Sequence, residues 1–126
     1  LLHADFLKEF RACCPSEWVL TAETSLNVSE ALLQTALEAV DAFIVDIKDM
    51  NPAIYEKYTG QGNERVLANL KLLAKYLPAK QVKIRVPRIP GYNSAEDVKA
   101  SVEKLKKMGF EQIEVFPYII RDTVKE

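Results

Sequence analysis

The sequence predicts an α/β fold in which four parallel βα units form part of a partial TIM-like barrel. Four strand-like runs alternate apolar with polar residues, and helix-like stretches separate them, so the strands are expected to be parallel and joined by crossovers. The runs cover 17–24, 42–48, 81–86 and 112–118. A doubly wound sheet carries helices on both faces, whereas a partial barrel is covered only on its outside. One face of the predicted sheet is polar, which favours the barrel.

Each of the four runs carries a pair of polar residues at alternate positions. Because successive side chains of a strand point to opposite faces, both members of a pair can lie on the same side of the sheet. The pairs are Thr21 with Glu23, Asp46 with Lys48, Lys83 with Arg85, and Gln112 with Glu114. We expect this side to line a polar cavity.

The stretches between the runs have helical spacing of apolar residues and recognisable end signals. Polar caps predict where helices start, and glycine or proline predicts where they end. The predicted starts are at Asn27 or Ser29, at Asn51, at Asn63 and at Ser94, and the predicted ends are at Pro15, Gly60, Pro78 and Gly109. A first helix over 4–14 precedes the first strand.

The composition is typical of a globular domain in the cytoplasm. The 126 residues suffice for one hydrophobic core, so we expect a single domain over 1–126. With 48% hydrophobic residues and no apolar run of about 20 residues, neither disorder nor a membrane span is expected. The 17 basic and 18 acidic residues form no basic stripe, so a nucleic-acid partner is not expected. The chain opens on Leu1 without an initiator methionine, which indicates a longer parent.

Charged residues gather where the predicted strands end, which is where parallel α/β sheets bind ligands. Glu23 and Asp46 offer hard oxygen ligands for a cation, while Lys48 and Arg85 could hold a carboxylate. This set suits a zwitterionic ligand. The alternative is purely structural, with the four side chains pairing with one another inside a barrel.

Two other functions are compatible with the same residues. One is a non-catalytic α/β module that binds a small anion or a protein partner on its polar concave face. The other is an aldolase-like barrel in which Lys48 forms a Schiff base, although Asp46 two residues away favours the charged ammonium. Tyr118, after the last strand, could stack on a base or complete a core.

Four short motifs, in order, resemble the radical S-adenosylmethionine activating enzymes of glycyl radical enzymes, most closely those that act on pyruvate formate-lyase. The motifs are Glu23-Thr24-Ser25, Asp46-Ile47-Lys48-Asp49-Met50, Ile84-Arg85-Val86 before Pro90-Gly91, and Phe116-Pro117-Tyr118. The resemblance covers nearly the whole chain. It implies that 1–126 is the carboxyl-terminal portion of a radical S-adenosylmethionine barrel.

The resemblance also implies a ligand set. A monovalent cation is held by Glu23, Thr24, Asp46 and the backbone carbonyl of Ile44, against the carboxylate of S-adenosylmethionine. The methionyl part of the cofactor lies near Lys48 and Arg85, and Tyr118 completes the cofactor-binding residues. In the family a 4Fe-4S cluster, reduced by a donor such as flavodoxin, cleaves the cofactor to a deoxyadenosyl radical, which abstracts hydrogen from a glycine of the partner enzyme.

The chain departs from the family pattern at three places. The family's cluster motif, Cys-x3-Cys-x2-Cys, is absent, and the adjacent Cys13 and Cys14 cannot replace it, so we expect this chain alone to be inactive. Leu26 stands where the acid-Thr motif usually ends in glycine, and a different loop is expected there. Ile119 replaces a histidine that contacts adenine.

Self-association through exposed strand edges is also expected.

Overall fold

The computed structural model describes residues 3–117 and contains one four-stranded parallel sheet. Its strand order is β1-β2-β3-β4, which is also the order along the chain. The strands are β1 (Thr21–Thr24), β2 (Ala42–Asp46), β3 (Val82–Arg88) and β4 (Gln112–Pro117). Sequential order with a helical crossover between consecutive strands is the topology of a βα barrel segment, and the predicted fold class is confirmed.

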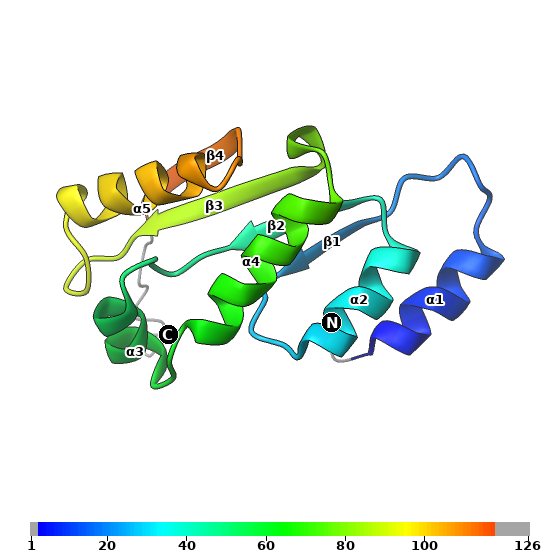
Figure 1. The fold of residues 1–126 in the computed structure, drawn as a ribbon, viewed down its shortest axis with the longest axis horizontal. Helices are drawn as coiled ribbons and strands as arrows, with labels where there is room; N and C mark the ends of the chain where they lie inside the picture. The colour runs from blue at the N-terminus through cyan, green and yellow to red at the C-terminus, as the bar shows by residue number, and fades with distance from the viewer. Residues whose placement is uncertain (1–2, 118–126) are drawn as a thin grey trace, which may run out of the picture.

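Five α-helices and a short 3₁₀ turn connect and precede the strands. They are α1 (Ala4–Cys13), α2 (Glu30–Ala39), α3 (Pro52–Thr59), α4 (Glu64–Tyr76), the 3₁₀ turn Ala79–Gln81 and α5 (Ala95–Lys107). Helices α2, α4 and α5 lie on the same side of the sheet, and α1 packs beside α2 (Figure 1). Among residues 3–117 the other face of the sheet carries no helix.

The helix ends follow the predicted caps. The side chain of Asn51 accepts hydrogen bonds from the amides of Ala53 and Ile54, with Pro52 in the first turn of α3. Ser94 forms a capping box with Asp97 at the start of α5. Of the two candidates for α2, Ser29 is the cap, because its hydroxyl accepts the amide hydrogen of Leu32.

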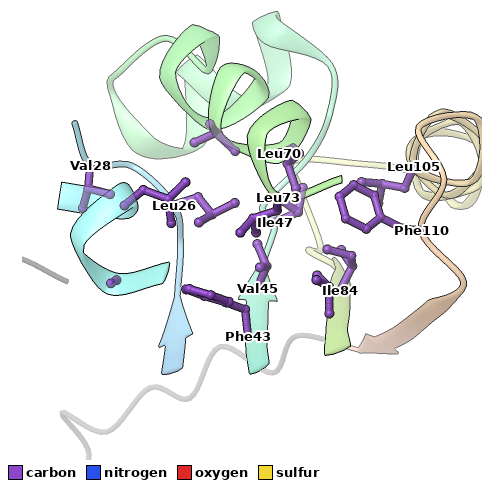
Figure 2. Close-up of a cluster of buried hydrophobic side chains, with 14 of the residues drawn as sticks. Leu26, Val28, Phe43, Val45, Ile47, Leu70, Leu73, Ile84, Leu105 and Phe110 are labelled. Atoms are coloured by element: carbon purple, nitrogen blue, oxygen red, sulfur yellow. The ribbon is translucent and has the colours of Figure 1, made fainter. Parts of the chain in front are cut away.

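The hydrophobic core lies between the sheet and the helices that cover it (Figure 2). Phe43, Val45 and Ile47 alternate with half-buried residues along β2 and just past its end, and all three are buried. From the helix side, the completely buried side chains include Leu33, Leu70, Leu73 and Leu105. This alternation sets the face of every strand residue, since a slip of one residue would turn the core outward.

Several predicted strand boundaries were wrong. The second strand ends at Asp46 rather than at 48, and the third starts at Val82 rather than at 81. The first strand starts at Thr21 rather than at 17, because the preceding residues form a turn in which the amide of Trp18 donates to the carbonyl of Pro15. The carbonyl of Trp18 accepts a hydrogen bond from the guanidinium of Arg11, and the indole ring of Trp18 stays half exposed. The third strand continues past 86 to Arg88, since β4 pairs with it to its end. Among the residues described, no helix is long and apolar enough to cross a membrane.

Candidate functional site

The face of the sheet without helices carries a row of alternating charges across three strands. Asp46 of β2 is in register with Arg85 of β3, which is in register with Glu114 of β4. The guanidinium Nη1 of Arg85 lies 3.6 Å from Asp46 Oδ1, and its Nε lies 3.3 Å from Glu114 Oε1. Lys83 Nζ pairs with the same carboxylate at 3.4 Å. The guanidinium carbon of Arg85 also stacks 4.3 Å from the ring centre of Phe116.

Asp46 has an acceptor that is not satisfied. Its Oδ1 atom is inaccessible to solvent and has no hydrogen-bond partner, and it is the one side-chain atom in this condition among residues 3–117. The contact with Arg85 is 3.6 Å, an ion pair that is too long for a hydrogen bond. Buried polar atoms in proteins nearly always have a partner, so an exception requires an explanation. A cation or a hydrogen-bond donor from a ligand would supply the missing partner.

The end of β1 brings one more predicted site residue to the same face. Glu23 is in register with Ile44, one position along the face from Asp46, and its side chain is exposed. The arrangement therefore places the carboxylates of Glu23 and Asp46 and the backbone of Ile44 on adjacent strands of one face. Oxygen ligands of this kind suit a hard cation.

Thr24 and Lys48 are placed differently. Thr24 is in register with Val45, a residue of the helix-covered side, and its hydroxyl oxygen accepts the amide hydrogen of Leu26 at 3.0 Å. One lone pair of that hydroxyl remains for a ligand. Lys48 lies just past the end of β2 and is half buried. Tyr118 lies outside the described residues, and the ligand roles of all these side chains stay predictions.

The loop after β1 contains a residue with a left-handed backbone. Leu26, which stands where glycine was expected, has φ of 62° and is completely buried. This conformation costs a residue with a Cβ roughly 1–2 kcal/mol, whereas glycine adopts it freely. The leucine therefore has a backbone conformation that glycine adopts more readily, and the expectation of a different loop stays a prediction.

The loops after β2 and β3 are joined by a buried polar network centred on Asp49. One carboxylate oxygen accepts from the amide of Asn51 and the hydroxyl of Ser101, and the other accepts from the side-chain amide of Asn93. Ser101 in turn accepts from the amide of Met50. The network fixes the backbone immediately after the Asp46-Ile47-Lys48 segment, and the sequence motifs did not reveal it.

Another buried asparagine, Asn69, was also missed. Asn69 of α4 is 2% exposed and lies within the apolar stripe formed by Val66, Leu70 and Leu73. A polar residue in the middle of an apolar helix stripe indicates a buried hydrogen-bonding side chain, and this pattern could have identified Asn69 from the sequence.

The described residues do not fit an iron-sulfur cluster. Cys13 and Cys14 are both free, and Cys13 is exposed at the end of α1. No group of three or more His, Cys, Asp or Glu side chains among residues 3–117 could hold a metal ion. A monovalent cation bound partly by backbone and solvent is a different case, because it does not need three such side chains.

Taken together, the fold and the site define a class of protein. A parallel βα sheet with helices on one side, and with charged residues at the carboxyl ends of its strands on the other, is part of a βα barrel, a fold whose active sites lie at the carboxyl ends of the strands.

The comparisons with known proteins identify the relatives. No protein-family model matches the chain. Indoleacetate decarboxylase activating enzyme of Tractidigestivibacter scatoligenes is 29% identical over 120 residues, which cover 94% of this chain and 38% of that protein. Pyruvate formate-lyase 1-activating enzyme of Escherichia coli strain K12 is 32% identical over 125 residues, 94% of this chain and 49% of that protein. (2S)-3-sulfopropanediol dehydratase activating enzyme of Klebsiella oxytoca is 38% identical over 95 residues, 74% of this chain and 29% of that protein.

A solved structure shows the same fold. A domain of pyruvate-formate lyase-activating enzyme from Bacteroides vulgatus matches with a TM-score of 0.75 and 22% identity, covering 98% of this chain and 81% of that chain. The homologues of this chain are thus glycyl-radical-enzyme activating enzymes, and the resemblance carried by the motifs is confirmed. The chain spans between 29% and 49% of the length of these three relatives.

Proposed function

We propose that the chain is the part of a radical S-adenosylmethionine activating enzyme that binds the methionyl end of the cofactor, in a protein that generates a glycyl radical on a partner enzyme. The observation that carries the proposal is the buried, unsatisfied Oδ1 of Asp46 beside Arg85, on the open face of the sheet. The homologous activating enzymes support it.

In this proposal each charged residue of the open face has a binding role. The carboxylates of Glu23 and Asp46, the hydroxyl of Thr24 and the carbonyl of Ile44 hold a monovalent cation, which contacts the carboxylate of S-adenosylmethionine. Arg85 contributes positive charge toward the same carboxylate, since its guanidinium already lies between Asp46 and Glu114.

Two further groups complete the cofactor site. Lys48 lies near the methionyl part, and Tyr118 belongs to the cofactor-binding residues. When bound and reduced by a 4Fe-4S cluster, S-adenosylmethionine supplies a deoxyadenosyl radical. The cluster is held by cysteines outside this chain, and its electron comes from a donor such as flavodoxin.

The experiment is a measurement of S-adenosylmethionine affinity in the full-length protein with its cluster reconstituted anaerobically. We expect Asp46→Asn to raise the dissociation constant by about 10-fold to 100-fold, because metal and cation sites lose this much when a ligand or its support is removed. Asp5→Asn, a matched change on exposed α1, is the control and should bind like the wild type.

Electron paramagnetic resonance separates binding from cluster loss. The signal of the reduced cluster without cofactor should be the same in wild type and Asp46→Asn, whereas its change on adding S-adenosylmethionine should be weaker in the variant. Equal dissociation constants would contradict the proposal for this residue. A parent protein without iron and without cofactor affinity would instead indicate the non-catalytic module.

A further inference from the structure

The backbone that follows β1 is held in an unfavourable conformation at a buried position. Leu26 has φ of 62° and no solvent exposure. Residues in sparsely populated regions persist when the surrounding structure over-determines them, and they cluster at ligand sites. Leu26 lies two residues after Thr24 and three after Glu23. Contacts that fix the backbone of Leu26 therefore also restrict the positions of the Thr24 and Glu23 side chains.

Helix α4 supplies the group that holds this loop. The side-chain nitrogen Nδ2 of Asn69 donates to the backbone carbonyls of Leu26 and Val28, in both cases at 2.8 Å. An amide nitrogen has two hydrogens, so this arrangement uses both of them. The two carbonyls lie on either side of Asn27, so one amide group holds the backbone that immediately follows the left-handed residue.

A second hydrogen bond transmits this constraint to the site. The amide of Leu26 donates to the hydroxyl of Thr24 at 3.0 Å, which orients that hydroxyl. The sequence of contacts runs from Asn69 to Leu26 and then to Thr24, the neighbour of Glu23. None of the charged residues on the open face takes part in it.

We propose that Asn69 is a positioning residue for the cofactor site, acting through the backbone of Leu26 to fix Glu23 and Thr24 at the end of β1, beside β2 and Asp46. This inference rests on the proposed function, because it concerns the same cation and cofactor. It adds a residue from the helix layer, on the side of the sheet opposite to the ligand.

A purely structural role for Asn69 makes a different prediction. Satisfying two buried carbonyls would contribute to stability alone, and the folded fraction of a variant would then bind cofactor normally. The test therefore needs readouts other than stability, and it has two arms.

The first arm needs no ligand. Amide hydrogen exchange of the folded protein should show the Leu26 amide exchanging at least about tenfold faster in Asn69→Ala than in wild type, since its hydrogen bond to Thr24 depends on the held loop. Asn63→Ala is the matched control. Asn63 is equally buried at the start of the same helix, but it donates to the carbonyl of Met50, so the Leu26 amide should be unchanged.

The second arm measures S-adenosylmethionine affinity in the full-length, cluster-loaded protein. Asn69→Ala should raise the dissociation constant by about 10-fold to 100-fold, as loss of outer positioning groups typically does. Val66→Ala truncates a buried α4 side chain that takes no part in the chain of hydrogen bonds from Asn69 to Thr24. It should change the dissociation constant by less than about threefold. In a Leu26→Gly background, Asn69→Ala should raise the dissociation constant by a smaller factor, because glycine adopts the positive φ without a supporting hydrogen bond.

The outcomes separate the two claims. A wild type that binds cofactor, together with an Asn69→Ala variant that binds as Val66→Ala does, overturns the positioning role and leaves the proposed function standing. A wild type with no affinity overturns the proposed function and with it the positioning role. The expected result for Asn69→Ala is faster exchange of the Leu26 amide together with weaker cofactor binding. The loss of binding should be smaller in the Leu26→Gly background.

Discussion

Leu26 combines a conformational cost with a burial gain at one position. Its left-handed backbone is unfavourable for any residue with a Cβ, while its side chain is completely removed from solvent. Full burial of a leucine contributes about 1.5–3 kcal/mol, which exceeds the backbone cost of roughly 1–2 kcal/mol. The balance explains how a leucine can occupy a position suited to glycine.

Two substitutions separate these contributions. Leu26→Ala and Leu26→Gly should both lower the free energy of unfolding, because each removes the buried side chain. The glycine variant should be the more stable of the two by about 1 kcal/mol, since it also removes the strain. Urea denaturation of both variants measures the difference, and an alanine variant at least as stable as the glycine variant would argue against strain at this residue.

Arg85 distinguishes a structural ion-pair network from a ligand site. Its side chain is 32% exposed and those of its partners Asp46 and Glu114 are 28% and 46% exposed, so solvent screens both pairs. Arg85→Gln should therefore change the free energy of unfolding by less than about 1 kcal/mol, while S-adenosylmethionine affinity falls about tenfold or more. A loss of several kcal/mol with normal affinity would support the structural alternative.

At the scale of elements, the loops after β2 and β3 depend on one carboxylate. Asp49 is 2% exposed, and its hydrogen-bond partners Asn51, Asn93 and Ser101 are all uncharged, so neutral hydrogen bonds stabilise its carboxylate. Buried networks of this kind are favourable only while every member is satisfied. They give the loops a single arrangement.

Removing one donor from this network should be costly. Asn93→Ala leaves Asp49 Oδ2 and the carbonyl of Pro87 without a partner, and it frees the amide of Ile89. We expect a loss of roughly 2–4 kcal/mol in the free energy of unfolding, because unsatisfied buried groups cost about 1–3 kcal/mol each and water relieves part of this. Asn27→Ala, at a half-buried loop asparagine, is the control. A cost below about 0.5 kcal/mol would show that water replaces the lost amide.

Helix α3 carries Tyr55, which is 3% exposed. Burial raises the pKa of Tyr55 above its usual 10.0. A pKa that is raised in the folded state contributes stability that is present below pH 10 and lost as the pH rises through the folded value. The free energy of unfolding should therefore fall more steeply above pH 10 in wild type than in Tyr55→Phe, and parallel pH profiles would contradict this.

The elements also show what a single sequence can predict. Helix caps such as Ser94 and the alternation along β2 were predictable because they depend on neighbouring residues. The start of β1 was not, because the turn before it depends on Arg11, whose guanidinium bonds both Trp18 and Asp41. Long-range contacts of this kind leave no period in the sequence.

The residues of the candidate site also fall into those that the local sequence pattern predicts and those that depend on tertiary contacts. Asp46, Arg85 and Glu23 were found because strand alternation places polar residues on one face, and the register confirms that placement. Asn69 and Asp49 were missed, because their role depends on which carbonyls and amides the tertiary fold brings within reach.

At the scale of the whole molecule, the helices cover one face of the sheet and leave its two edge strands accessible. Strand β4 pairs only with β3 among residues 3–117, and Val115 is 52% exposed on it. Beside it, Val98 and Val102 of α5 help to line an apolar groove of about 420 Å³. An accessible strand edge next to apolar surface favours pairing with a second copy of the chain.

This geometry predicts weak self-association of the chain. Sedimentation velocity over increasing concentration should show the weight-average sedimentation coefficient rising for wild type and staying constant for Val115→Lys, because a charged residue on an edge strand opposes pairing. Val19→Lys is the matched control, since Val19 is 74% exposed but lies outside the sheet, and it should associate like wild type. A wild type that remains monomeric, or equal effects of the two lysines, would show that the β4 edge is not the contact.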